Sequence, residues 1–150
     1  MDIAELEAEA ARLILPRFDA DTALRLGQIL VDLADGLPVV INIRTAQRTC
    51  FHAALPGAQA TNDNWARRKS NTALMMGRAS MAVGLKNAAR GTTLARDGLP
   101  EADYADHGGA VPILVAGVGM VAVATVSGLP QEDDHRLVIR GIEALLAELE

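Results

Sequence analysis

The sequence predicts one α+β domain in which helices flank a largely antiparallel sheet. The first indication is an uncharged run, residues 108–131, which is rich in valine and interrupted by glycine and proline. The second is a pair of short apolar stretches between residues 37 and 55. The third is helical periodicity at both ends of the chain. At 150 residues, the chain has the length of a single domain.

Two helices are predicted before the first strand. Apolar side chains recur at helical spacing over residues 3–13, and this helix ends by Pro16. A second helix begins near Asp19 or Asp21, since either carboxylate can cap its first turn. It ends near Gly36, which is placed for a left-handed cap.

An antiparallel pair of strands is predicted next, over Leu37–Thr45 and Arg48–Leu55. If the loop between them has only two residues, Ile43 faces Cys50 and Ile41 faces His52 across the pair. In that register Phe51 points to the opposite face, beside Asn42.

Two helical stretches and a long loop are predicted to follow. The first helix covers the run NDNWARRKSNTALMMG, from Asn62 to Gly77, and the second covers Ser80 to Ala89. The segment from Gly91 to Gly109 is polar and has no clear period, so it is predicted to be a loop.

The uncharged run is predicted to form a buried hairpin. It is long enough to cross a bilayer as a helix, but its prolines and glycines disfavour a helix and its valines favour strands. We therefore expect strands over Val111–Ala116 and Gly119–Ser127. Pro130 then begins the last helix, where the acidic residues 132–134 complement the positive end of the helix dipole.

Composition limits the function classes. The net charge of −5 argues against a general nucleic-acid binder, which needs a basic surface. The single cysteine, Cys50, excludes an intramolecular disulfide and is typical of a reducing compartment. The N-terminus is acidic and lacks the cationic start of a signal peptide. We therefore expect a cytoplasmic protein with no membrane and no nucleic-acid partner.

The histidines give the first candidate site. His52, His107 and His135 are the only three, none is spaced like a zinc-binding pair, and no metal site is predicted. They can still converge in space, and any one can ligate haem iron, although a hydrogen-bonded or surface histidine is the commoner case. At His107-Gly108-Gly109 the glycines let a ligand approach the backbone amides. A tight turn before the next strand explains them equally well.

A basic run and a strand-to-helix turn give further candidates. Arg67, Arg68 and Lys69 can hold carboxylates or phosphates, with Trp65 as a flat apolar wall. A solvated helix face, with Trp65 at a subunit contact, is the commoner role. The Ser127-Gly128 turn can offer amides to an anion, although the acids after it favour a capping role. No complete catalytic set emerges, so catalysis is not predicted.

Five short motifs stand in a fixed order along the chain. They are FHAALPG (Phe51–Gly57), NDNWARRK (Asn62–Lys69), YADHGG (Tyr104–Gly109), VPI (Val111–Ile113) and VSGLPQEDDH (Val126–His135). Together they resemble an uncharacterised family of the haem-degrading-domain superfamily, also called GlcG/HbpS-like. The likeness runs from about Leu37 to the C-terminus.

The resemblance implies a profilin-like fold, with an antiparallel sheet of about five strands flanked by helices. This agrees with the predicted order ααββααββα, in a single domain over residues 1–150 with residues 1–16 as an N-terminal helical extension. The fifth strand would come from the loop over residues 91–109. The resemblance also implies homo-oligomers, dimers or larger, and some superfamily members bind haem or take part in its breakdown.

The sequence therefore leads to one main hypothesis, an oligomeric protein that binds a small ligand near a subunit interface. Haem or another planar carboxylated molecule is the first choice of ligand. The predicted lining is Trp65, Arg68, Lys69, His107, Gly108, Gly109, Ser127 and Gly128. The alternative is a non-catalytic structural or adaptor protein that acts through protein–protein contacts.

Overall fold

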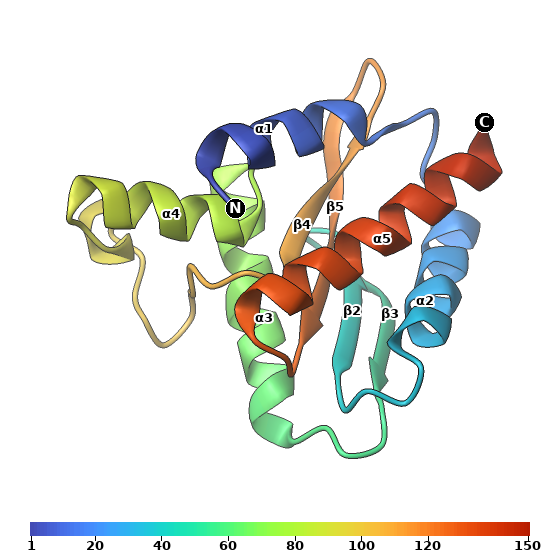
Figure 1. Cartoon of the computed structure of the whole chain (residues 1–150), viewed down its shortest axis with the longest axis horizontal. Helices are drawn as coiled ribbons and strands as arrows, with labels where there is room; N and C mark the ends of the chain where they lie inside the picture. Colours follow the sequence, from blue (N-terminus) through green and yellow to red (C-terminus); the bar gives the residue numbers. More distant parts are fainter.

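A computed structural model describes all 150 residues and contains five α-helices, one short 3-10 helix and one five-stranded sheet (Figure 1). In chain order the elements are α1 (Ile3–Arg12), β1 (Ile14–Leu15), α2 (Ala20–Ala34), β2 (Val40–Arg44), β3 (Thr49–Ala54), α3 (Ala60–Met76), α4 (Ser80–Arg90), the 3-10 helix η1 (Leu94–Asp97), β4 (Ala110–Val115), β5 (Gly119–Ser127) and α5 (Gln131–Leu149).

The sheet confirms the predicted α+β class and strand number and corrects two details. Its strand order is β1-β4-β5-β2-β3, and every pair is antiparallel except β1 with β4, which is parallel. The sheet is therefore mixed. The fifth strand is β1, and the prediction that it comes from residues 91–109 was wrong. Two residues are too few to show a strand alternation, and the long loop forms η1 instead.

The register of β2 and β3 also differs from the prediction. Arg44 faces Thr49, as a two-residue link requires, but the register then shifts and leaves Cys50 without an opposite residue. Beyond this bulge, Ile43 faces Phe51 and Asn42 faces His52. The extra residue moves every later side chain of β3 to the other face of the sheet.

Helix ends follow the predicted caps. The Asp19 carboxylate accepts a hydrogen bond of 2.9 Å from the backbone N–H of Thr22, so α2 begins at the first of the two predicted caps. Gly77 has a φ of +68° and ends α3 in the left-handed conformation, as the sequence indicates.

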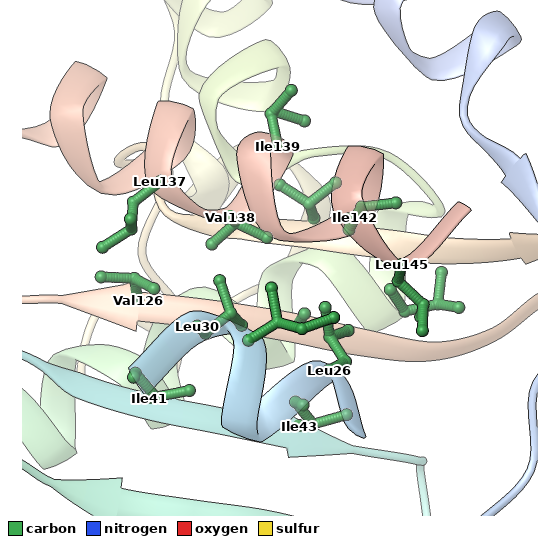
Figure 2. Packing of buried hydrophobic residues seen from close by; sticks show 14 of the residues in the cluster. Leu26, Leu30, Ile41, Ile43, Val126, Leu137, Val138, Ile139, Ile142 and Leu145 are labelled. Atoms are coloured by element: carbon green, nitrogen blue, oxygen red, sulfur yellow. The ribbon is translucent and has the colours of Figure 1, made fainter. Parts of the chain in front are cut away.

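Helices cover both faces of the sheet, which gives three layers. In Figure 1, α2 and α5 lie on one face and α3 lies on the other. The face under α2 and α5 holds the largest hydrophobic core, in which Leu26, Leu30, Ile41, Ile142 and Leu145 pack together (Figure 2). On the opposite face, side chains of β2 and β5 meet α3 and include several polar residues.

None of the helices combines the length and the apolar character that crossing a membrane requires. The uncharged run instead forms the central hairpin of the sheet, β4 and β5, as predicted.

Candidate functional site

The central candidate is a cleft between α3, the His107–Gly109 segment and the turn from β5 into α5. Its volume is about 250 Å³. Its lining residues are Asn62, Trp65, Lys69, His107, Gly108, Ser127, Gly128, Leu129, Gln131 and Asp134. Six of the eight residues predicted from sequence are in this set. Arg68 and Gly109 are not, although both contact residues that are.

Two aromatic rings form one wall of the cleft. The centroids of the Trp65 and His107 rings are 5.1 Å apart, and the ring planes are tilted by 54°. The guanidinium of Arg68 lies over the indole of Trp65, 4.4 Å from its centroid, which is a cation–π contact. Trp65 is half-buried and His107 is exposed, so the wall presents a fixed indole beside an accessible imidazole.

A buried ion pair forms the floor. Lys69 and Asp134 are 2% and 3% exposed, and Lys69 Nζ lies 3.2 Å from Asp134 Oδ2. Lys69 Nζ also donates to the carbonyl oxygens of Gly108, at 3.0 Å, and Val126, at 2.8 Å. The Asp134 carboxylate in turn accepts from the backbone N–H of Leu129 at 2.9 Å. The pair therefore joins α3, the His107 segment, the end of β5 and α5.

Burial sets the direction of both pKa shifts in this pair. It lowers the pKa of Lys69 and raises the pKa of Asp134, because each charge has lost its water. The opposite charge of the partner counteracts the shift in each case. The extra hydrogen bonds to backbone groups are what make an ion pair tolerable at this depth.

These contacts correct the role predicted for Lys69 and explain the glycines. All three Nζ donors of Lys69 are used inside the protein, so Lys69 is not a free cation for a ligand. Gly109 has a φ of +137°, and a Cβ there would collide with Lys69 Nζ. Packing against the buried lysine therefore accounts for Gly109 without a ligand.

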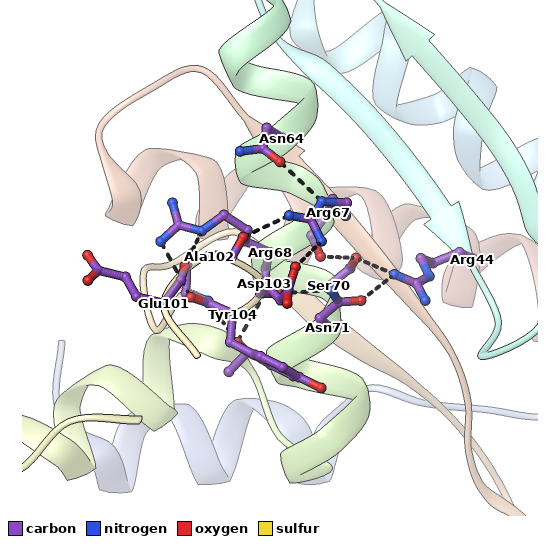
Figure 3. Close-up of polar contacts among 12 residues, drawn as sticks. Arg44, Asn64, Arg67, Arg68, Ser70, Asn71, Glu101, Ala102, Asp103 and Tyr104 are labelled. Atoms are coloured by element: carbon purple, nitrogen blue, oxygen red, sulfur yellow. Dashed lines mark hydrogen bonds and ion pairs between the residues drawn. The ribbon is translucent and has the colours of Figure 1, made fainter. Parts of the chain in front are cut away.

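The two arginines of the basic run on α3 are tied to a neighbouring loop, although the Arg67 side chain stays 45% exposed. Arg67 donates to the Asp103 carboxylate, at 3.0 Å, and to the Ala102 carbonyl, at 2.8 Å. Arg68 Nε donates to the Glu101 carbonyl at 2.8 Å. Figure 3 shows these side chains directed at the loop that precedes His107. Both arginines hold this loop against α3.

The three histidines do not converge, and no group of His, Cys, Asp and Glu is arranged to hold a metal ion. Both ring nitrogens of His52 have partners, since Nδ1 lies 3.0 Å from Asn42 Nδ2 and Nε2 lies 2.7 Å from Asp63 Oδ1. His135 is fully buried, with Nε2 2.6 Å from Glu9 Oε1. His135 Nδ1 has no hydrogen-bond partner but is buried, whereas His107 is exposed and makes no hydrogen bond or ion pair in the protein.

Three clefts meet at His107. Besides the central one, a cleft of about 290 Å³ continues past Trp65 and Arg68 to Leu94 and Tyr104. Another, of about 320 Å³, lies between His107 and α4. His107 therefore lines three neighbouring clefts.

Sequence reasoning missed two residues that shape the site. Asp134 was predicted only as one of three acids near a helix start, and its pairing with Lys69 across 65 residues left no local pattern. Gln131 accepts a hydrogen bond of 3.0 Å from the Gly108 N–H and so fixes the segment next to His107. The only sequence feature that could have indicated these two residues is their position shortly after the buried strand β5.

Comparison with known proteins places this chain in a family. Residues 18–143 match the family model described as "Haem degrading protein HbpS-like", and the chain belongs to the HbpS-like family. Within it, the chain is 46% identical over 149 residues to a UPF0303 protein of Streptomyces coelicolor. That alignment covers 97% of this chain and 94% of the relative. The GlcG/HbpS-like resemblance of the sequence is thereby confirmed.

Solved structures show the same fold. The crystal structure of the Ybr137w protein superposes with a TM-score of 0.86 at 30% identity, over 99% of this chain and 89% of that one. The crystal structure of a PduOC:heme complex superposes with a TM-score of 0.72 at 22% identity, over 85% of this chain and 94% of that one.

Proposed function

We propose that this chain is a homo-oligomeric binding protein whose small ligand lies against Trp65 and His107, near a subunit interface. Haem is our first choice of ligand, and another planar carboxylated molecule is the broader class. The proposal concerns binding, and no reaction is assigned to the site.

One observation carries the proposal: His107 is the exposed histidine to which the protein supplies no hydrogen-bond partner. The imidazoles of His52 and His135 are engaged by Asp63 and Glu9, whereas His107 lines three neighbouring clefts without a protein partner. An imidazole nitrogen is a common axial ligand of haem iron, and His107 meets the first requirement for that role. Haem, when bound, supplies the iron centre.

The surroundings of His107 suit a flat molecule. The indole of Trp65 offers an aromatic face 5.1 Å from the imidazole, and offset or tilted ring contacts favour planar partners. Arg68 is held by the Glu101 carbonyl through Nε, which keeps its positive charge beside the clefts for a carboxylate. A structural neighbour, PduOC, was solved as a heme complex, which supports the same ligand class here.

The sheet edge supports the oligomer part of the proposal. β3 is the last strand of the sheet and carries the sequence TCFHAA, which has no lysine, arginine, acid or proline. Edge strands in monomers are usually protected by such residues, since bare backbone groups pair with other strands. The bulge at Cys50 interrupts this edge, and the regular stretch beyond it, Phe51–Ala54, favours pairing with a second copy of the chain.

The test is a haem titration followed at the Soret band. We expect a saturable shift with the unmodified protein, its loss in His107→Ala, and its retention in the matched control His52→Ala. His52 is also partly exposed, but both its ring nitrogens have partners. Absence of a shift, or the same shift in both variants, would contradict haem ligation by His107.

The adaptor alternative makes a different prediction. If Trp65 acts in protein contacts, Trp65→Ala changes the oligomer size measured by light scattering. The same variant then has no effect on the haem titration at the Soret band. An unchanged assembly together with weakened haem binding would support the ligand site instead.

A further inference from the structure

A second cleft, whose lining does not include His107, lies between the β2–β3 hairpin and α3. Its volume is about 270 Å³, and it shares no lining residue with the central cleft. It is lined by Asn42, Arg44, Thr45, Ala46, Gln47, Arg48, Thr49, His52, Asp63, Ala66, Arg67 and Ser70. Only two of the twelve are hydrophobic, so this is a polar site.

The lining is strongly positive on a chain that is negative overall. Three guanidinium groups, from Arg44, Arg48 and Arg67, face one carboxylate, that of Asp63. With His52 neutral, the lining residues sum to +2, and the carboxylate of Asp103, which pairs with Arg67 from outside the lining, reduces this to +1, whereas the whole chain carries −5. A concentration of one sign of charge in a hollow raises the local concentration of the opposite ion.

Arg44 is the one guanidinium of this cleft that is half-buried. Its Nη1 donates to neutral acceptors, Ser70 Oγ at 3.1 Å and Asn71 Oδ1 at 2.8 Å (Figure 3). Its Nε donates to the Thr45 carbonyl. No carboxylate pairs with it. Burial and the nearby positive charge of Arg67 both lower the pKa of Arg44, because each disfavours the charged form. A half-buried guanidinium beside another one, without a counter-ion, is an unfavourable arrangement that an anion relieves.

Neighbouring acids are already engaged elsewhere. The carboxylate of Asp63 lies 2.7 Å from His52 Nε2, and that of Asp103 lies 3.0 Å from Arg67 Nη1. Neither forms an ion pair with Arg44 or Arg48. The cleft therefore retains positive charge without a counter-ion, because its nearest carboxylates pair with other groups.

The hairpin turn presents Arg48 to the same space. The Thr45 N–H donates to the Arg48 carbonyl at 2.9 Å, and the Arg48 N–H donates to Thr45 Oγ1 at 3.1 Å. These two bonds fix the backbone of the turn, while the Arg48 side chain makes no ion pair or hydrogen bond in the protein. Arg48 is exposed and lines the cleft opposite α3.

We propose that this cleft binds the phosphate group of a small phosphorylated molecule, with Arg44 and Arg48 as its principal ligands. Guanidinium forks match the geometry of phosphate oxygens. A phosphate monoester carries a charge of about −1.5 to −2 at neutral pH, which matches the two guanidinium groups without a carboxylate partner, Arg44 and Arg48, better than a single carboxylate does. The volume leaves room for a small group beyond the phosphate.

Inorganic phosphate, phenyl phosphate and acetate are the probes, titrated at constant ionic strength and followed by amide chemical shifts in NMR. We expect saturable shifts that cluster at residues 44–49 and 67–71 for both phosphates, and at least tenfold weaker binding for acetate. Arg48→Gln should weaken phosphate binding by about tenfold or more, since one charge-assisted hydrogen-bonding group is lost.

The control is Arg140→Gln, which removes an exposed arginine of α5 that lies outside the cleft and should leave binding unchanged. Arg44→Gln should weaken binding as much as Arg48→Gln, and because Arg48 is exposed, the test does not depend on Arg44→Gln folding. Absence of saturation, equal affinities of Arg48→Gln and Arg140→Gln, or acetate binding as tightly as phosphate would overturn the proposal.

Discussion

The two faces of the sheet are buried by different means. Under α2 and α5 the contacts are almost entirely aliphatic, as around Leu30 and Ile142 (Figure 2). Under α3 the buried residues include Lys69, Thr72 and Thr125. The aliphatic face holds the largest cluster of buried apolar side chains. The α3 face buries polar groups in place of some apolar contacts. The central cleft and the arginine-lined cleft both lie along this face.

The largest effect on stability is expected at the buried ion pair of the α3 face, Lys69 and Asp134. Lys69→Met leaves Asp134 buried without its counter-ion and removes the donor to two backbone carbonyls. We expect a loss of about 3–5 kcal/mol in the free energy of unfolding, measured by urea denaturation.

A double variant separates charge pairing from packing. Replacing both partners, in Lys69→Met with Asp134→Leu, removes the unpaired charge and should recover part of the loss. Recovery is expected to be partial because the Gly128 and Leu129 amides lose their acceptor. A double variant as unstable as the sum of the two single ones would contradict this account of the α3 face.

On the aliphatic face, the expected loss in the free energy of unfolding is somewhat smaller, and no second substitution is expected to recover it. Leu30→Ala creates a cavity beneath Gly141 of α5, and a loss of about 2–5 kcal/mol is typical of such a change. The matched control on the same helix is Leu24→Ala, where the leucine is 48% exposed, and its loss should stay within about 0.5 kcal/mol. Similar losses in the two variants would mean that α2 does not pack through Leu30.

The smallest effect is a dependence on pH that belongs to Lys69. Because burial lowers its pKa below the ordinary 10.5, the native protein releases this proton at a lower pH than the unfolded chain. Between the two values the unfolded state binds more protons, so the free energy of unfolding rises with pH. The slope is at most about 1.4 kcal/mol per pH unit.

The comparison that reveals this slope is between the unmodified protein and Lys69→Met. Titrating groups that do not contact Lys69 are common to both and cancel. Asp134 does not cancel, because loss of the Lys69 charge raises the pKa of Asp134 further in the variant, and this adds to the same trend. The stability difference should therefore grow as the pH approaches 10.5. A difference that shrinks over this range would contradict the buried position of Lys69.

Local patterns in the sequence predicted most of the fold. The cap at Asp19, the end of α3 at Gly77 and the β4–β5 hairpin each depend on residues close in sequence, and each is confirmed. Strand β1 was missed because two residues have no periodicity, and the bulge at Cys50 was missed because an extra residue leaves no compositional mark.

The site was predicted in part for the same reason. The motifs around Trp65, His107 and Ser127 were recognised one by one, and the structure places all three around one cleft. The buried state of Lys69 could not be predicted, because a basic residue in a basic run resembles a solvated one until Asp134 is brought to it. The unpaired charge of Arg44 likewise depends on where Asp63 and Asp103 find their partners.

The most direct measurement of the central claim, that the polar face of the sheet is a ligand site in an oligomer, is native mass spectrometry of protein purified with haem present. We predict an oligomer in which each subunit carries one haem, with the added mass lost in His107→Ala and kept in His52→Ala. A monomer, or an oligomer whose added mass is the same in both variants, would contradict the claim.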